Sequence, residues 1–96
     1  MDTLTLDDIE LSESELSELD DLINKRSIVL FNDDVNTFEH VIMCLIKYCD
    51  HELCQAEQCA MVVHNNGKCS VKSGKFENLK PIAEALLENN LSVKIL

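Results

Sequence analysis

A short apolar run that ends in three adjacent polar residues constrains the fold of this chain more than any other feature. Residues 28–31 are Ile-Val-Leu-Phe, a composition typical of a strand that is buried on both faces. Asn32, Asp33 and Asp34 follow directly, with no glycine or proline before them. Carboxylate and amide oxygens at such a junction can hold a small cation, but a solvated turn uses the same side chains to bond its own backbone. The sequence alone leaves both interpretations open.

Two helices are expected after this strand. Asn36 and Glu39 have the spacing of a helix N-cap and its N3 partner, and apolar residues then recur at intervals of three and four as far as Tyr48. Asp50 has the position of a second N-cap. The helix that it opens is expected to end at Gly67, because glycine is the residue most typical of helix C-caps.

The remaining residues predict two more strands and one more helix. A strand is expected over residues 69–72, a turn over 73–74, a helix over 76–87 despite Pro81, and a last strand over 91–96. The order is therefore strand, helix, helix, strand, helix, strand. This order predicts an α+β fold, in which a small three-stranded antiparallel sheet packs against three helices on one face.

The first part of the chain differs in charge from the rest. Residues 1–26 contain nine of the eighteen acidic residues and two basic ones, a net charge of −7. We therefore expect an acidic, flexible and mostly disordered tail over residues 1–26, followed by one domain over 27–96. Ser12 and Glu15 form a capping-box pattern ahead of several leucines, so a short amphipathic helix can form in the tail. A helix of about a dozen residues is marginal in water by itself.

Composition excludes several classes of function. The net charge of −10 argues against a nucleic-acid partner, because phosphate binding needs a basic surface. No window contains the roughly 20 apolar residues that span a bilayer, and the first residues are acidic where a signal peptide is basic. We therefore expect a soluble, cytoplasmic protein with no membrane partner, whose five cysteines are reduced thiols.

The cysteines do not predict a metal site. Cys44, Cys49, Cys54 and Cys59 stand at intervals of five residues, and five residues turn a helix by about 140°, so successive thiols point to different faces. We expect no metal, and small thiols that pack among apolar side chains. No thiol has the neighbours of a catalytic cysteine. His64, a lone histidine at a helix end, is typical of a capping or packing residue when it is taken without further context.

Four short motifs occur in order along the chain: Asn32-Asp33-Asp34, Asn36-x-x-Glu39-x-Val41, Met61-Val62-Val63-His64 and Gly67-Lys68. Together they resemble the ClpS family, adaptors that bring proteins with bulky apolar N-terminal residues, called N-degrons, to the Clp ATP-dependent protease. The resemblance covers residues 27–96. It implies an α+β domain behind a flexible tail, which agrees with the fold expected from the periodicity.

The resemblance also implies a binding site. Asn32, Asp34 and His64 are implied to bind the α-amino group of the substrate, and Asp33 to support them. The implied pocket for the first side chain is lined by Leu30, Phe31, Asn36, Phe38, Val41, Ala60, Val63 and Val93. Such a site is physically sensible, because an ammonium group has three donors and needs acceptors on more than one side.

The sequence departs from the usual pattern of the family at three pocket positions. Asn36 stands where threonine is common, and Phe38 and Ala60 stand where methionine is common. Phe38 fills space and Ala60 frees it, so a reshaped pocket is expected. The segment around residues 72–76 is also shorter than is typical of the family.

The family implies a non-enzymatic adaptor without a cofactor. Its expected partners are N-degron proteins and the N-terminal domain of a Clp unfoldase of the ClpA or ClpC type. An alternative is a protein-interaction module that resembles the C-terminal domain of the ribosomal stalk protein and does not bind N-degrons. A peptide that loses binding on N-acetylation separates these two, and stoichiometric zinc would indicate a third class, a metal-dependent enzyme.

Overall fold

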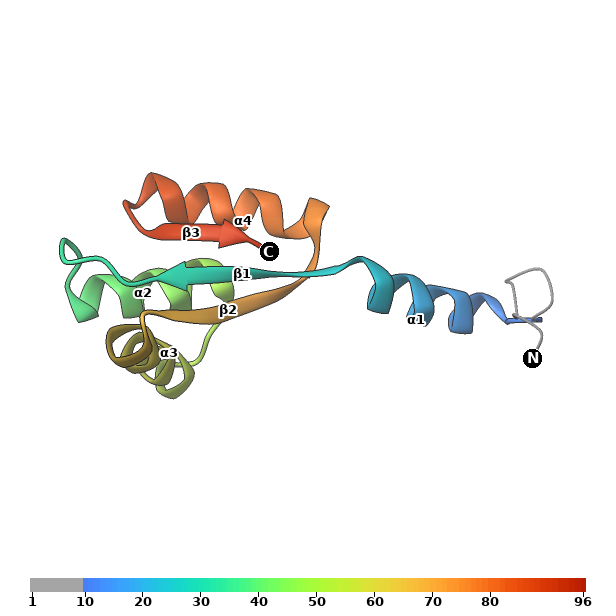
Figure 1. Ribbon diagram of the computed structural model, residues 1–96, viewed down its shortest axis with the longest axis horizontal. Coiled ribbons are helices and arrows are strands. Elements are labelled where there is room, and N and C mark those ends of the chain that lie inside the picture. Colours follow the sequence, from blue (N-terminus) through green and yellow to red (C-terminus); the bar gives the residue numbers. More distant parts are fainter. Residues whose placement is uncertain (1–9) are drawn as a thin grey trace.

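The computed structural model describes residues 10–96. Within this range the chain forms a small α+β domain from which an N-terminal helix projects (Figure 1). The elements in order are α1 (Glu13–Asn24), β1 (Lys25–Phe31), α2 (Phe38–Cys49), α3 (Leu53–Asn66), β2 (Lys68–Lys75), α4 (Phe76–Glu88) and β3 (Ser92–Ile95). No helix in the described part of the chain is long and apolar enough to cross a membrane.

The strand β1 is the centre of the sheet. The order is β2-β1-β3, and β1 pairs antiparallel with both neighbours. Its pairing with β2 shifts between Ile28, which faces Lys72, and Val29, which faces Ser70. Val71 is the additional residue, so β2 has a bulge there. The expected three-stranded antiparallel sheet is confirmed.

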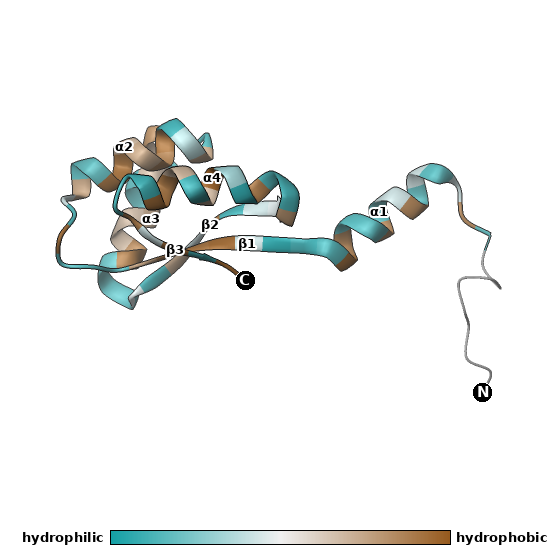
Figure 2. Ribbon diagram, turned by 90° about the horizontal axis from the view of Figure 1, so that it is seen from above, coloured by the Kyte–Doolittle hydropathy of each residue, from teal (hydrophilic) through white to brown (hydrophobic). Residues whose placement is uncertain are grey.

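The hydrophobic core lies between the sheet and three helices. Ile28 and Leu30 are 0% and 2% exposed, whereas Val29 between them is only half-buried, so one face of β1 is covered far better than the other. Figure 2 shows α2, α3 and α4 on the same side of the sheet. Leu45 from α2 and Leu86 from α4 complete the centre of the core. Each of these side chains contributes about 1.5 to 3 kcal/mol by its burial.

Two predicted helix caps were wrong. The helix α2 is capped by Thr37, whose hydroxyl accepts from His40 N–H at 3.1 Å, and not by Asn36, whose side chain bonds elsewhere. Asp50 ends α2 in the left-handed conformation, with φ 58°, and so does not open α3. The N-cap of α3 is Glu52, which makes no side-chain cap bond. Aspartate tolerates the left-handed conformation better than most residues, which explains its place at a helix end.

The predicted turn over residues 73–74 was also wrong. Ser73 and Gly74 continue β2, because β1 begins at Lys25 and not near residue 28, and its extra residues pair with them. The hydroxyls of Ser27 and Ser73 are 3.0 Å apart across this pair. Pairing with β1 therefore outweighs the preference of Ser73 and Gly74 for a turn. The other strands and helices match their expected positions within a few residues.

The tail contains the helix α1, which begins as the sequence indicates. The Ser12 hydroxyl accepts from Glu15 N–H at 3.2 Å. The helix buries no residue, and Lys75 of β2 forms ion pairs with Asp20 at 3.1 Å and Asp21 at 3.4 Å. Residues 1–9 of the expected tail lie outside the described range, and the flexibility of the tail stays a prediction.

His51 is a buried polar residue that supports the bulge in β2. It is 6% exposed, and its Nε2–H donates to the carbonyl of Val71, the additional residue of the bulge. A carbonyl oxygen can only accept, so Nε2 carries the proton. Nδ1 has no partner among the described residues.

We expect the substitution His51→Ala to lower the free energy of unfolding by about 2 to 4 kcal/mol, because it removes the donor to Val71 and opens a cavity. Urea denaturation followed by circular dichroism measures this change. Asn65→Ala is the matched control, since Asn65 is exposed, and its effect should stay within about 0.5 kcal/mol. A loss for His51→Ala as small as that of the control would contradict the assigned role.

Candidate functional site

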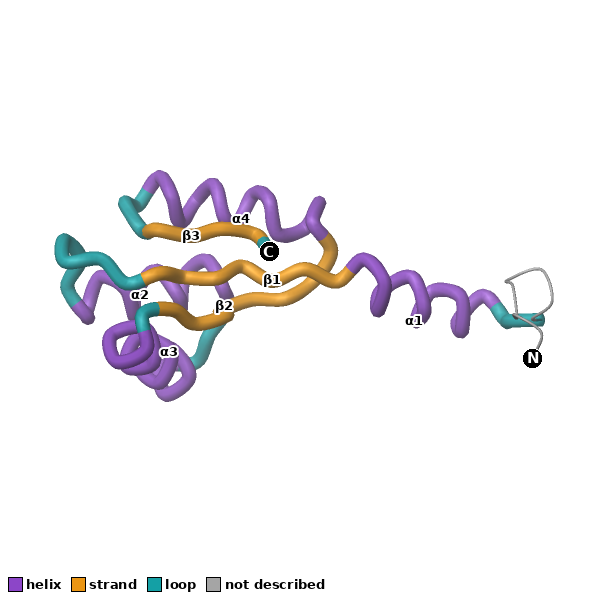
Figure 3. The backbone as a smooth tube through the Cα atoms, in the orientation of Figure 1, coloured by secondary structure: helices purple, strands orange, loops and turns teal. Residues whose placement is uncertain are grey.

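A pocket of about 70 Å³ lies where the loop between β1 and α2 faces α3. The antiparallel topology places three connections at this end of the sheet: the loop over residues 32–37, the α3–β2 turn and the α4–β3 turn (Figure 3). The pocket therefore collects side chains from distant parts of the sequence. Its lining residues are Leu30, Phe31, Asn32, Asp33, Asn36, Thr37, Phe38, Val41, Ala60, Val63, His64 and Leu91.

Core residues form the apolar part of the pocket. Leu30, Val63 and Leu91 are buried and belong to the hydrophobic core, so their positions are fixed by the packing of the whole domain. Ala60 is also buried, and its small side chain leaves space against α3. An apolar group that enters the pocket would meet surfaces that are already packed, so little reorganisation is required.

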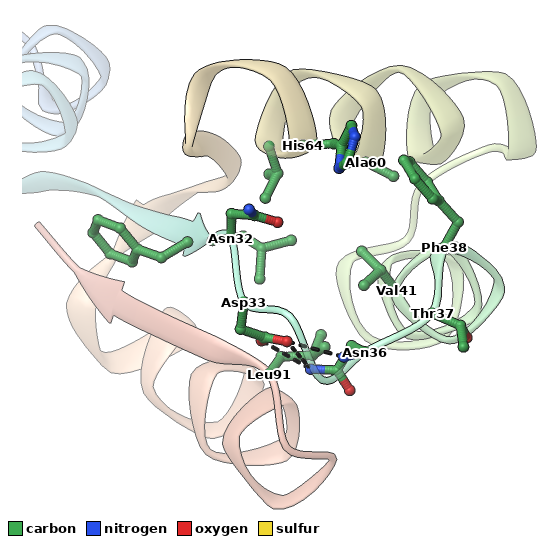
Figure 4. Close-up of a pocket in the computed structure, with 12 residues that line it drawn as sticks. Asn32, Asp33, Asn36, Thr37, Phe38, Val41, Ala60, His64 and Leu91 are labelled. Carbon is green, nitrogen blue, oxygen red and sulfur yellow. Dashed lines mark hydrogen bonds between the residues drawn. The ribbon is translucent and has the colours of Figure 1, made fainter.

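Asn32 and His64 form a polar end of the pocket. Asn32 N–H donates to the carbonyl of Gly67 at 2.8 Å, which holds the end of β1 against the end of α3, and α3 carries His64. Figure 4 shows both side chains on the same side of the pocket. The amide oxygen of Asn32 and a neutral imidazole nitrogen of His64 are hydrogen-bond acceptors. This end is therefore suited to a donor.

Phe38 lies beside His64 at the rim. Their ring centroids are 5.3 Å apart and the rings are tilted by 58°. Aromatic rings pack favourably in such tilted arrangements. Phe38 is the first residue of α2, so the capping of that helix by Thr37 also sets the position of this aromatic ring.

Asp33 has a different role from Asn32, because its carboxylate is bonded within the loop. It accepts from Val35 N–H and Asn36 N–H, both at 3.0 Å, and from Asn36 Nδ2 at 3.0 and 2.9 Å. Burial raises the pKa of Asp33, but the bonds from Asn36, Val35 and Ser92 outweigh it, so the pKa lies below its ordinary value of 3.8. Asp33 therefore matches the turn interpretation of residues 32–34, in which the side chains bond the backbone of their own loop.

The structure brings together most of the residues that the sequence pointed to. Asp34 is exposed and does not line the pocket, and Val93 is 8% exposed within the core, on the groove between α4 and β3. Thr37 and Leu91 line the pocket, although the sequence did not single them out. Leu91 follows a left-handed residue, Asn90, and only the tertiary arrangement places it near α2.

The cysteines lie apart from this site. Cys44 and Cys49 are buried as expected, and burial raises the pKa of the Cys49 thiol to about 11, whereas Cys54 is exposed. Within residues 10–96 no group of three or more histidine, cysteine or acidic side chains is arranged to hold a metal ion. The chemistry of the pocket is instead that of acceptors beside an apolar surface, which fits a ligand with a cationic donor and an apolar group.

Comparison with known proteins identifies relatives. The family described as ATP-dependent Clp protease adaptor protein ClpS matches residues 24–93. The ATP-dependent Clp protease adapter protein ClpS of Thermosynechococcus vestitus is 34% identical over 67 residues, which cover 69% of this chain and 71% of that protein. The human E3 ubiquitin-protein ligase UBR1 is 31% identical over 75 residues, which cover 71% of this chain. This chain spans only 4% of the length of the ligase.

A solved structure shares the fold. ClpS2 of Agrobacterium tumefaciens, determined with bound L-phenylalaninamide, superimposes with a TM-score of 0.71 at 18% sequence identity. The match covers 76% of this chain and 95% of that one. At this identity the comparison establishes the architecture.

The lowered pKa of Asp33 generates a prediction. The bonds to its carboxylate are complete above the ordinary carboxyl range and are lost as the pH falls through the lowered pKa. Asn36→Ala removes the amide donor, so we expect the pKa of Asp33 to rise toward 3.8. The carboxyl carbon shift of Asp33, followed by NMR against pH, measures this. Val35→Ala keeps its backbone donor and should not alter the titration. An unchanged pKa in Asn36→Ala would show that the amide is not a cause.

Proposed function

The chain belongs to the ClpS family of ATP-dependent Clp protease adaptors, and we propose that it recognises N-degrons and delivers them to a Clp unfoldase. In this proposal the pocket binds the free α-amino group and the bulky apolar first side chain of a substrate protein. The protein itself catalyses no reaction. One observation carries the proposal: Asn32 and His64 present acceptors at one end of a pocket whose other walls are apolar.

The polar end suits an N-terminal ammonium group. Such a group has three donors and a positive charge, and Asn32 and a neutral His64 can accept two of its hydrogen bonds. Asp34 is exposed on the same loop, where its carboxylate attracts the ammonium from a greater distance. Asp33 supports the site by holding the loop in shape. An acetylated N-terminus loses both the charge and two donors, so it should be rejected.

The apolar walls suit a large first side chain. Burial of a leucine or phenylalanine side chain in such a pocket contributes about 1.5 to 3 kcal/mol. L-phenylalaninamide, the compound bound to the similar ClpS2, combines a free α-amino group with an apolar aromatic side chain. This compound has the two features that the present pocket is suited to bind. Leu30, Phe31, Val41, Ala60, Val63 and Leu91 would contact the side chain.

We assign Val93 an indirect role, because it is a core residue of β3 that pairs with Leu30 of β1, and Leu30 lines the pocket. Phe38 lies at the rim, so it would set which first residues can enter, whereas the side-chain amide of Asn36 is bonded to Asp33 and Asn90 and would hold the loop. The partner that receives the substrate is inferred to be the N-terminal domain of a ClpA-type or ClpC-type unfoldase in the cytoplasm. The acidic helix α1 is the segment best placed to take part in this transfer, since it projects from the domain (Figure 1).

The amine site can be tested with His64→Ala and Asn32→Ala. We expect each substitution to weaken binding of a Leu-initiated peptide at least about tenfold, because each removes an acceptor from a charged donor. Fluorescence anisotropy with a labelled peptide measures the affinity, and the N-acetylated peptide should bind poorly to all proteins. Asn65→Ala, next to His64 but away from the pocket lining, is the matched control. Unchanged affinity in both variants, with intact circular dichroism, would refute the site.

Deletion of residues 1–24 should separate binding from delivery. The deletion removes α1, which buries no residue, and two exposed ion pairs to Lys75 that contribute little to stability. We expect the affinity for a Leu-initiated peptide to stay within about a factor of two, whereas degradation of a Leu-initiated protein by purified Clp protease should fall. A substrate that needs no adaptor is the control. Unreduced degradation with the deletion variant would show that residues 1–24 take no part in delivery.

A further inference from the structure

The side-chain amide of Asn36 joins two parts of the chain that are 54 residues apart in sequence. Its Nδ2 lies 3.0 and 2.9 Å from the two carboxylate oxygens of Asp33 (Figure 4). The same nitrogen lies 2.9 Å from the carbonyl oxygen of Asn90. Thr37 already caps α2, so these bonds are not part of a helix cap. Asn36 therefore connects the loop over residues 32–37 to the turn between α4 and β3.

The turn that receives this bond is itself held from two sides. Asn90 has a left-handed conformation, with φ 67°, and its N–H donates to Leu87 O at 3.0 Å, which closes the end of α4. The carbonyl of Asn89 accepts from His40 Nε2–H of α2 at 2.8 Å. The side-chain amide of Asn89 donates to Tyr48 Oη at 3.2 Å. The turn is thus attached to both α4 and α2.

The loop is consequently fixed at both of its ends. At the first end, Asn32 N–H donates to Gly67 O of the α3–β2 turn, and at the second end Asn36 donates to Asn90 O. Asp33 joins the two ends through its four bonds to Val35 and Asn36. The apolar walls are held independently, because Leu30 and Val63 belong to the core.

We propose that Asn36 is a positioning residue that makes recognition of a free amine depend on the α4–β3 turn. This inference rests on the proposed function. When the bond to Asn90 is lost, the loop that carries Asn32 and Asp34 is no longer tied to the α4–β3 turn, while the apolar walls keep their places. The protein then loses selectivity for the amine and keeps its affinity for the apolar side chain.

The selectivity can be measured with two peptides that share a leucine-like first side chain. One has a free α-amino group, and in its desamino analogue hydrogen replaces that group. In Asn36→Ala we expect the ratio of the two affinities to fall about tenfold, with the affinity for the desamino analogue within about twofold of that of the unmodified protein. Val35→Ala is the matched control, because Val35 is in the same loop, is 86% exposed and has no polar side-chain atom.

A charge-conserving exchange tests whether a contact between positions 33 and 36 is sufficient without a donor to Asn90. Asp33→Asn combined with Asn36→Asp restores a donor and an acceptor at positions 33 and 36, but leaves no donor toward Asn90 O. We expect this double variant to have the same low selectivity as Asn36→Ala. A double variant with the selectivity of the unmodified protein would overturn the inference, since the contact within the loop would then be sufficient.

Amide hydrogen exchange measured by NMR separates positioning from general destabilisation. The backbone N–H groups at positions 35 and 36 should exchange faster in Asn36→Ala, whereas the N–H of Leu45 in the core should not change. Faster exchange throughout the domain would overturn the inference. If the unmodified protein itself fails to prefer the free amine, the proposed function fails; if it does prefer the amine and Asn36→Ala retains that preference, only this inference fails.

Discussion

The backbone bond from Asn32 N–H to Gly67 O is the contact on which the candidate site depends. It ties the end of the central strand to the end of α3, and so places the first residue of the polar triplet beside the helix that carries His64. Gly67 makes this possible with a φ of 90°, a left-handed conformation that ends α3 and turns its carbonyl toward β1. A residue with a Cβ would be strained there. A backbone contact, and not a side-chain contact, thus brings the two acceptors together.

The division of the pocket into a polar and an apolar part follows from the two kinds of element that form it. Strand and helix residues such as Leu30 and Val63 face the core, so the apolar walls share the stability of the whole domain. The acceptors lie on a loop and at a helix end, where side chains can remain solvated until a ligand arrives. Ala60 changes the shape of the walls, whereas Phe38 both shapes the rim and lies beside His64, with ring centroids 5.3 Å apart. The side-chain pocket and one of the two acceptors are therefore linked through Phe38.

The sequence predicted the architecture because the spacing of apolar residues along the chain indicates which residues of a strand or helix are buried. The apolar run over residues 28–31 and the helical repeats after it identified β1, α2 and α3, and the family motifs identified most of the pocket lining. Predictions of caps and turns were wrong where a distant partner decided the outcome. Asn36 has the position of an N-cap, but its amide is used by Asp33 and by Asn90, which is 54 residues away. The strand pairing of Ser73 with Ser27, and the place of Leu91 in the pocket, likewise depend on residues far along the chain.

These long-range partners also explain why the pocket is located at one end of a three-stranded sheet. An antiparallel sheet of order β2-β1-β3 places the end of β1 beside the beginnings of β2 and β3, so three connections meet there (Figure 3). Backbone groups at these strand ends have no further strand to bond, and each must find another partner. The carbonyls of Gly67 and Asn90 find theirs in the loop over residues 32–37. The bonds that hold the loop over residues 32–37 at its two ends are therefore bonds to the turns that lead into β2 and β3, and this loop contains no glycine or proline.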